Sequence, residues 1–186
     1  RYFMYPSVYQ HHTTRIINSM FRRCLNKLSQ LQLVDPEKTY LYDDSDIICT
    51  ARSQQGYAED IIKRLDNRSI YKTIYSLKLD EIIEPEKVFK TSANDIKNIE
   101  EEISEDLKID KEHIIFDIPE YPSFHEMSTP ILLDGEIKKL GDISLIVSAL
   151  NQARFNHADL CIYLPEEYSD KALDFPFKDY IPFELK

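Results

Sequence analysis

Glycine is scarce in this chain, with 3 glycines among 186 residues. Walker-type and dinucleotide-binding loops both need several closely spaced glycines, so a glycine-rich phosphate loop is excluded. No apolar run approaches about 18 residues, and the first residues lack a signal-peptide pattern, so we expect neither a membrane span nor secretion. The 3 cysteines are odd in number and far apart, which favours reduced thiols over a disulfide framework. These absences predict a cytoplasmic globular protein.

Carboxylates are missing from the first 34 residues, although the chain carries 33 Asp and Glu in total. The same stretch contains arginines, a lysine, two histidines and several tyrosines. One interpretation is a local positive field that attracts phosphate or nucleic acid. The other is a buried helix whose apolar face leaves little room for acids. The net charge of −10 argues against nucleic-acid binding by the whole surface, so any anion site must be local.

The first third of the chain is predicted to be helical. Pro6 suits the first position of a helix, and apolar residues at three- and four-residue spacing continue that helix to about Val34. Two further helices are expected over 44–54 and 57–65, separated by Gly56. We assign residues 1–67 to one helical unit.

After residue 68 the pattern changes to short strands and helices. Strands are expected over 70–79, 113–118 and 159–164, helices over 92–107 and 142–154, and a hairpin around Asp134-Gly135. The order strand, helix, strand, strand, helix, strand predicts a ferredoxin-like βαββαβ domain over 68–165, followed by a tail over 166–186. The predicted fold class is therefore α+β.

The opening residues could contact a nucleotide. Arg1 would approach the first helix in extended chain, and Tyr9, Gln10 and His12 would lie within its first two turns. Arginine binds phosphate through two N–H groups, tyrosine packs on a base or sugar, and glutamine hydrogen-bonds a base edge. Ordinary helix packing is the competing interpretation.

Two segments carry a family resemblance. RYFMYPSVYQHHTTR at residues 1–15 and RLDNRSIYK at 64–72 resemble the C-terminal half of HD-superfamily phosphohydrolases, in the deoxynucleoside triphosphate triphosphohydrolase branch. The resemblance implies a metal-dependent hydrolase that releases triphosphate from a deoxynucleotide.

The resemblance also implies roles for individual residues. Arg1 would contact phosphate, Tyr5 would lie by the sugar and phosphates, and Tyr9 and Gln10 would lie against the sugar and base. His12 falls where some relatives bind a regulatory nucleotide with a basic residue.

The metal motif of that family is missing from this sequence. It requires a His, a His-Asp dipeptide and a later Asp, and no His-Asp dipeptide occurs here. Those ligands precede the matching segment in the family. We therefore expect a fragment of a longer polypeptide, with a divalent metal in the full-length protein and no metal ligand or catalytic residue in this part.

Two other function classes are open. A non-catalytic module could sense a ligand or join subunits through the βαββαβ unit, and a homo-oligomer is expected in either case. RNA binding through the sheet is disfavoured, because the region after residue 68 is acidic and lacks a glycine-aromatic signature.

Weaker candidates have structural explanations. The acids at 43, 44 and 46 are expected to cap a helix rather than bind a cation, and Arg64 and Arg68 to complement a helix C-terminus. The run Glu100-Glu101-Glu102 is expected to be a solvated helix face, and Cys49 a core residue.

Overall fold

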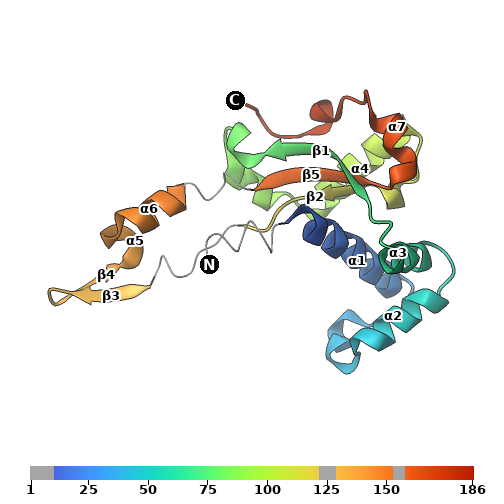
Figure 1. The fold of residues 1–186 in the computed structure, drawn as a ribbon, viewed down its shortest axis with the longest axis horizontal. Helices are drawn as coiled ribbons and strands as arrows, with labels where there is room; N and C mark the ends of the chain where they lie inside the picture. Colours follow the sequence, from blue (N-terminus) through green and yellow to red (C-terminus); the bar gives the residue numbers. More distant parts are fainter. Residues whose placement is uncertain (1–10, 122–128, 153–157) are drawn as a thin grey trace.

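The computed structural model describes residues 11–121, 129–152 and 158–186. A three-stranded antiparallel sheet lies between two layers (Figure 1). The N-terminal helices cover one face of the sheet, and helix α4 with the C-terminal segment covers the other. In the described residues, no helix combines the length and apolar character that crossing a bilayer requires.

The N-terminal layer consists of α1 (His12–Gln30), the 3-10 helix η2 (Pro36–Leu41), α2 (Asp44–Ser53) and α3 (Tyr57–Asp66). Within the described residues helix α1 begins at His12, and His11, with an extended ψ of 132°, caps it by accepting a hydrogen bond from the Thr13 N–H. The predicted start at Pro6 lies outside the described residues. The helix ends before Val34, since Gln32 adopts a left-handed φ of 59°. The other two predicted helices are confirmed almost to the residue.

The sheet contains β1 (Lys72–Lys78), β2 (Ile115–Asp117) and β5 (Asp159–Leu164) in the order β1-β5-β2. Strand β5 is central and almost fully buried, so its alternate residues face opposite layers. Ile162 packs in the core beneath α4, whereas Cys161 and Tyr163 pack against the N-terminal helices.

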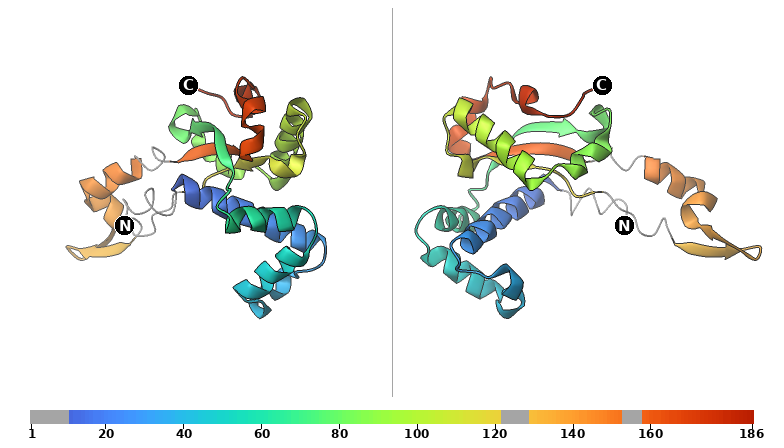
Figure 2. Two further views of the ribbon diagram at one scale, coloured as in Figure 1. Left: turned by 45° about the vertical axis from the view of Figure 1, so that its right-hand side comes forward. Right: turned by 180° about the vertical axis from the view of Figure 1, so that it is seen from behind.

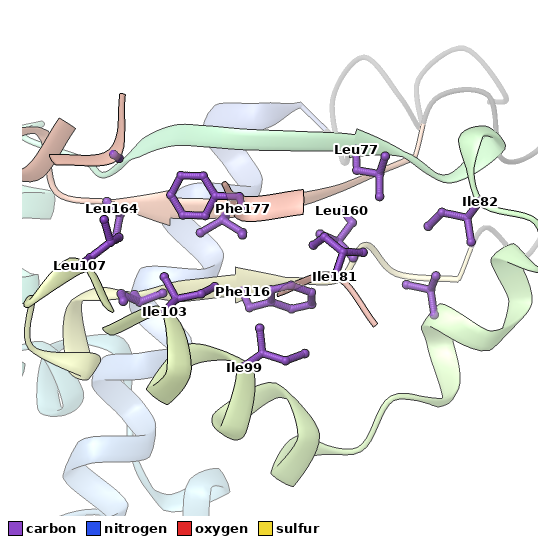
Figure 3. Close-up of a cluster of buried hydrophobic side chains, with 14 of the residues drawn as sticks. Leu77, Ile82, Ile99, Ile103, Leu107, Phe116, Leu160, Leu164, Phe177 and Ile181 are labelled. Atoms are coloured by element: carbon purple, nitrogen blue, oxygen red, sulfur yellow. The ribbon is translucent and has the colours of Figure 1, made fainter. Parts of the chain in front are cut away.

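The layer on the other face is built around α4 (Ala93–Leu107), which begins with a capping box between Ser92 and Asp95. The remaining elements of this layer and its connections are short: η3 (Leu79–Glu81), η4 (Pro85–Lys90), η5 (Lys111–His113), η7 (Glu166–Tyr168), α7 (Ser169–Ala172) and η8 (Phe177–Tyr180). Ile99, Ile103 and Leu107 of α4 point toward the sheet, and Phe177 and Ile181 of the C-terminal segment join the same core (Figure 3).

Residues 130–152 form a separate arm. It contains the hairpin β3 (Pro130–Leu133) and β4 (Glu136–Lys139), followed by α5 (Leu140–Ile143) and α6 (Leu145–Gln152). The arm stands away from the body of the protein in every view, with the hairpin at its tip (Figures 1 and 2). Asp134 and Gly135 both have positive φ, 52° and 83°, as the predicted two-residue turn requires.

The arm changes the predicted topology. Strands β3 and β4 form their own two-stranded sheet instead of joining the central one, so a ferredoxin-like arrangement is not clearly shown, while the α+β class is confirmed. The predicted helix over 142–154 is divided at Ser144, which is extended and accepts a hydrogen bond from the Val147 N–H through Oγ (3.4 Å). A serine that caps a new helix therefore interrupts the apolar spacing.

Candidate functional site

Four of the predicted nucleotide contacts, Arg1, Tyr5, Tyr9 and Gln10, lie outside the described residues. His12 is described: it is exposed in the first turn of α1, and its ring centroid lies 4.3 Å from that of His11. The segment that contains these candidates therefore leads directly into the N-terminal end of α1, where the helix dipole favours anions.

The acid-free helix α1 is matched by acids from the other half of the chain. From the N-terminal to the C-terminal end of α1, Arg15 pairs with Asp117 at the end of β2, Arg23 with Glu100 of α4, and Lys27 with Glu112 of η5. Most of the helix's positive charge is thus used to dock α1 on the αβ part. Both interpretations of the acid-free segment therefore hold in part: α1 carries a positive charge, and acids of the same chain pair with most of it.

Asp117 is the centre of the most buried of these contacts. Its Oδ2 accepts hydrogen bonds from Arg15 Nη2 (2.5 Å) and from the Tyr163 hydroxyl (2.9 Å), and its Oδ1 accepts one from Ser19 Oγ (2.8 Å). The side chains of Arg15 and Asp117 are 10% and 9% exposed. Three donors satisfy one buried carboxylate, so the cluster joins α1, β2 and β5 rigidly.

The surroundings of Asp117 shift the ionisation of its neighbours. Burial lowers the pKa of the Arg15 guanidinium, but the Asp117 carboxylate opposes this and leaves that pKa above its ordinary value. Burial, followed by the negative charge of Asp117, raises the pKa of the Tyr163 hydroxyl. Burial also raises the pKa of the Cys161 thiol, which lies 3.9 Å from Arg15 Nη1. These shifts favour a fixed ion pair between Arg15 and Asp117, with Tyr163 and Cys161 neutral beside it, over proton transfer among the four groups.

Glu100 makes the second buried contact. It is 3% exposed and accepts hydrogen bonds from Arg23 and from the Phe116 N–H (2.9 Å). Burial raises the pKa of Glu100, while the Arg23 charge acts in the opposite direction. The prediction that the run 100–102 is a solvated face is therefore wrong for Glu100, because one acid of the run turns inward to meet α1.

A hollow of about 260 Å³ lies between α1 and α4, and residues of β2 also line it. Arg22, Asn26 and Lys97 line it as exposed hydrogen-bond donors, and the internally paired Glu100 and Asp117 also line it. Such a groove can hold a small polar molecule. In the described residues, no group of three His, Cys, Asp or Glu side chains is arranged to hold a metal ion.

A third polar cluster surrounds His113. Its Nδ1 lies 3.0 Å from the Tyr71 hydroxyl, and its ring contacts Tyr57 and Tyr168. The Tyr57 hydroxyl is buried without a hydrogen-bond partner in the described structure, and burial raises the pKa of Tyr57. Arg64 lies over the Tyr71 ring and pairs with acids of α3 and η7.

Sequence reasoning did not find the buried acids or the His113 cluster. One signal was present for Asp117, which is a carboxylate inside the apolar run 114–118. The structural interpretation of Arg64 is confirmed by its ion pairs, and Asp43 and Asp46 form the expected capping box. The expectation for Cys49 is wrong, because Cys49 of α2 is exposed.

Comparison with known proteins agrees with this architecture. A protein of Methanocaldococcus jannaschii, described as uncharacterized, is 26% identical over 188 residues, which cover 100% of this chain and 40% of that protein. The crystal structure of a hypothetical protein from Aquifex aeolicus matches with a TM-score of 0.61 and 22% identity, over 93% of this chain and 42% of that chain. At that identity the structural likeness concerns the fold alone. The chain thus spans about two fifths of the length of these relatives.

The family comparison covers almost the whole chain. The model described as "HD associated region" matches residues 1–185, including both the N-terminal helices and the αβ part. The chain therefore belongs to the family of HD-associated regions.

Proposed function

We propose that this chain is the C-terminal, HD-associated part of a metal-dependent nucleotide phosphohydrolase. The reaction would convert a deoxynucleoside triphosphate into a deoxynucleoside and triphosphate. The observation that carries the proposal is the match of residues 1–185 to a region that accompanies HD domains. The greater length of the relatives leaves room for a separate catalytic unit.

In this proposal the chain supplies one wall of the substrate pocket. Arg1 would bind phosphate, Tyr5 would lie by the sugar and phosphates, and Tyr9 and Gln10 would contact sugar and base. His12 would contact a regulatory nucleotide. The chemistry of these side chains supports the assignment, since a guanidinium, phenols and a carboxamide match phosphate, sugar and base.

The anchoring of α1 supports the same assignment. Arg15, one turn into the helix, is held by Asp117, and further along the helix Arg23 is held by Glu100. Because ion pairs fix α1 at several positions, the helix is a rigid attachment for the segment that precedes it, and a binding site needs such rigid support. The divalent metal would be held by a His, His-Asp and Asp arrangement elsewhere in the longer polypeptide, where it would activate a water molecule.

The test is triphosphate release by the longer polypeptide that contains this chain. With a divalent metal, it should hydrolyse deoxynucleoside triphosphates, whereas residues 1–186 alone should not. Arg1→Ala in the longer polypeptide should lower kcat/KM by about 10- to 100-fold, because a hydrogen bond to a charged group is worth about 1.5–3 kcal/mol.

Arg52→Ala is the matched control. It removes an exposed arginine of α2 that lies outside the proposed contact set and pairs with Asp66 at the surface, so kcat/KM should stay near the parent value. A metal-loaded longer polypeptide that leaves every deoxynucleoside triphosphate intact would refute the substrate assignment. Equal losses for the two variants would refute the role of Arg1.

A non-catalytic module for ligand sensing or subunit assembly is the alternative. The exposed arm at residues 130–152 favours assembly over ligand sensing, since it presents large apolar side chains to solvent. An assembly role is compatible with a catalytic unit elsewhere in the polypeptide.

A further inference from the structure

The arm exposes more apolar surface than a small element normally leaves in water. Its tip and helices carry several large apolar side chains at high exposure: Leu132 72%, Leu133 40%, Ile137 77%, Ile143 38%, Leu145 88% and Ile146 73%. An isolated two-stranded hairpin is marginally stable in water, and exposed apolar patches mark interaction sites. The arm therefore requires a partner surface.

The two most exposed hairpin residues lie side by side. Leu132 and Ile137 are directly opposite in the β3–β4 ladder, so both side chains are on the same face of the hairpin. Glu136 and Lys138 lie on the other face, where their side chains form an ion pair of 3.3 Å within the strand. One face of the hairpin thus carries the exposed pair Leu132 and Ile137, and the other carries Glu136 and Lys138 opposite Leu133 and Ile131.

Strand β4 presents an edge suited to another strand. In the described residues it pairs with β3 alone. Leu133 and Glu136 flank the turn and face each other across the ladder. In a hairpin with a two-residue turn, such a flanking pair exchanges backbone hydrogen bonds, so the N–H and C=O of the next residue, Ile137, point to the open edge.

We propose that β4 pairs antiparallel with β4 of a second copy of this chain, about a two-fold axis centred on Ile137. This register places Ile137 opposite Ile137 of the second copy and Glu136 opposite Lys138 of the second copy. The second pairing occurs twice because of the symmetry. The two hairpins become one four-stranded sheet, and Leu132 and Ile137 form an apolar row that continues across the axis.

Charge selects this partner and this register. The strand carries one acid and one base on the same face, two residues apart, which is complementary to its own antiparallel copy. A shift by one residue in each strand would instead place Lys138 opposite Lys138 of the second copy, and like charges directly opposite are destabilising. Two copies of a chain with a net charge of −10 repel each other overall, and this edge gives them a contact in which opposite charges pair.

The experiment is sedimentation equilibrium of the chain and two single variants, Glu136→Lys and Lys138→Glu. The parent chain should dimerise. Each variant alone places two like-charged pairs across the axis and should raise the dimer dissociation constant by about tenfold or more. An equimolar mixture of the two variants restores two opposite-charge pairs and should dimerise like the parent chain.

Two controls accompany these variants. The double variant E136K/K138E exchanges the charges and should also dimerise like the parent, whereas Ile137→Lys should weaken the dimer. Asp174→Lys makes the same charge change as Glu136→Lys on an exposed site of the body and should leave the dimer unchanged. Far-UV circular dichroism should be the same for all variants, because the substituted side chains are exposed.

Two results would overturn the proposal. One is a parent chain that stays monomeric at every concentration, which would assign the arm to another segment of a longer polypeptide or to a different protein. The other is a dimer whose dissociation constant does not respond to the single variants or to their mixture, which would place the interface elsewhere.

Discussion

Replacing Asp117 by alanine tests the view that buried ion pairs fix α1 on the sheet. The variant removes the acceptor shared by Arg15, Ser19 and Tyr163. Arg15 is left with a side chain that is 10% exposed and, within the part of the chain that the structure describes, without its ion-pair partner. Because breaking a buried pair from one side costs about 3–5 kcal/mol, we expect a loss of that size in the free energy of unfolding.

Equilibrium urea unfolding followed by far-UV circular dichroism measures this loss. The transition midpoint should fall while the slope of the free energy against urea stays constant, since the surface exposed on unfolding is almost unchanged. For a chain of this length, the same loss corresponds to a decrease in Tm of roughly 6–20 °C. Hydrogen exchange should show faster opening of α1 than of α4.

Asp66→Ala is the control. It breaks the ion pair between Arg52 and Asp66, whose side chains are 52% and 46% exposed, so unfolding should change little. The double variant R15M/D117L should be more stable than Asp117→Ala, because no unpaired charge stays buried, and less stable than the parent, because the Ser19 and Tyr163 hydroxyls lose their acceptor. If D117A and D66A had the same effect, the buried cluster would not hold α1 in place.

The remaining predictions concern buried hydroxyl and thiol groups. Tyr71→Phe removes the hydrogen bond to His113 and should lower the unfolding free energy by about 1 kcal/mol. Tyr57→Phe removes a buried hydroxyl without a partner in the described structure and should be neutral or stabilising. Urea unfolding of the two variants checks this, and a larger loss for Tyr57→Phe would contradict it. With a thiol reagent at pH 8, Cys49 should react quickly and Cys24 slowly, because Cys24 is buried and burial raises its pKa to about 11. Cys49→Ser should abolish the fast phase, and its persistence would refute the assignment. Because the folded-state pKa of Cys24 is raised above the ordinary value of 9.0, its contribution to stability is present below pH 9 and is lost as the pH rises toward 11. Cys24→Ala lacks this contribution, so its unfolding free energy should fall less steeply than that of the parent between pH 9 and pH 11.

Much of the fold could be predicted because its signals are local. Apolar spacing and the caps at Asp43 and Ser92 place α2 and α4 within a residue or two of their observed bounds. The Asp134-Gly135 dipeptide predicts the hairpin turn, since both positions need positive φ. The division of the last predicted helix at Ser144 was missed, because a serine inside a helical pattern is a cap only when the chain turns there.

The candidate site was predictable only in part. The absence of acids from α1 was visible, but its partners, Asp117, Glu100 and Glu112, lie 77 to 102 residues away in sequence. No local rule relates such distant charges, and Glu100 cannot be distinguished from its neighbours Glu101 and Glu102 without knowing which side of α4 faces α1.

The sequence by itself determined the helices, the strands, the hairpin turn and the lack of a glycine-rich phosphate loop, because these depend on neighbouring residues. Only the tertiary structure decided that β3 and β4 leave the central sheet and form an exposed arm. It also decided that the charges of α1 are neutralised within the chain. Strand order and long-range ion pairs depend on which surfaces exclude water together, and that is a property of the packed chain rather than of any segment.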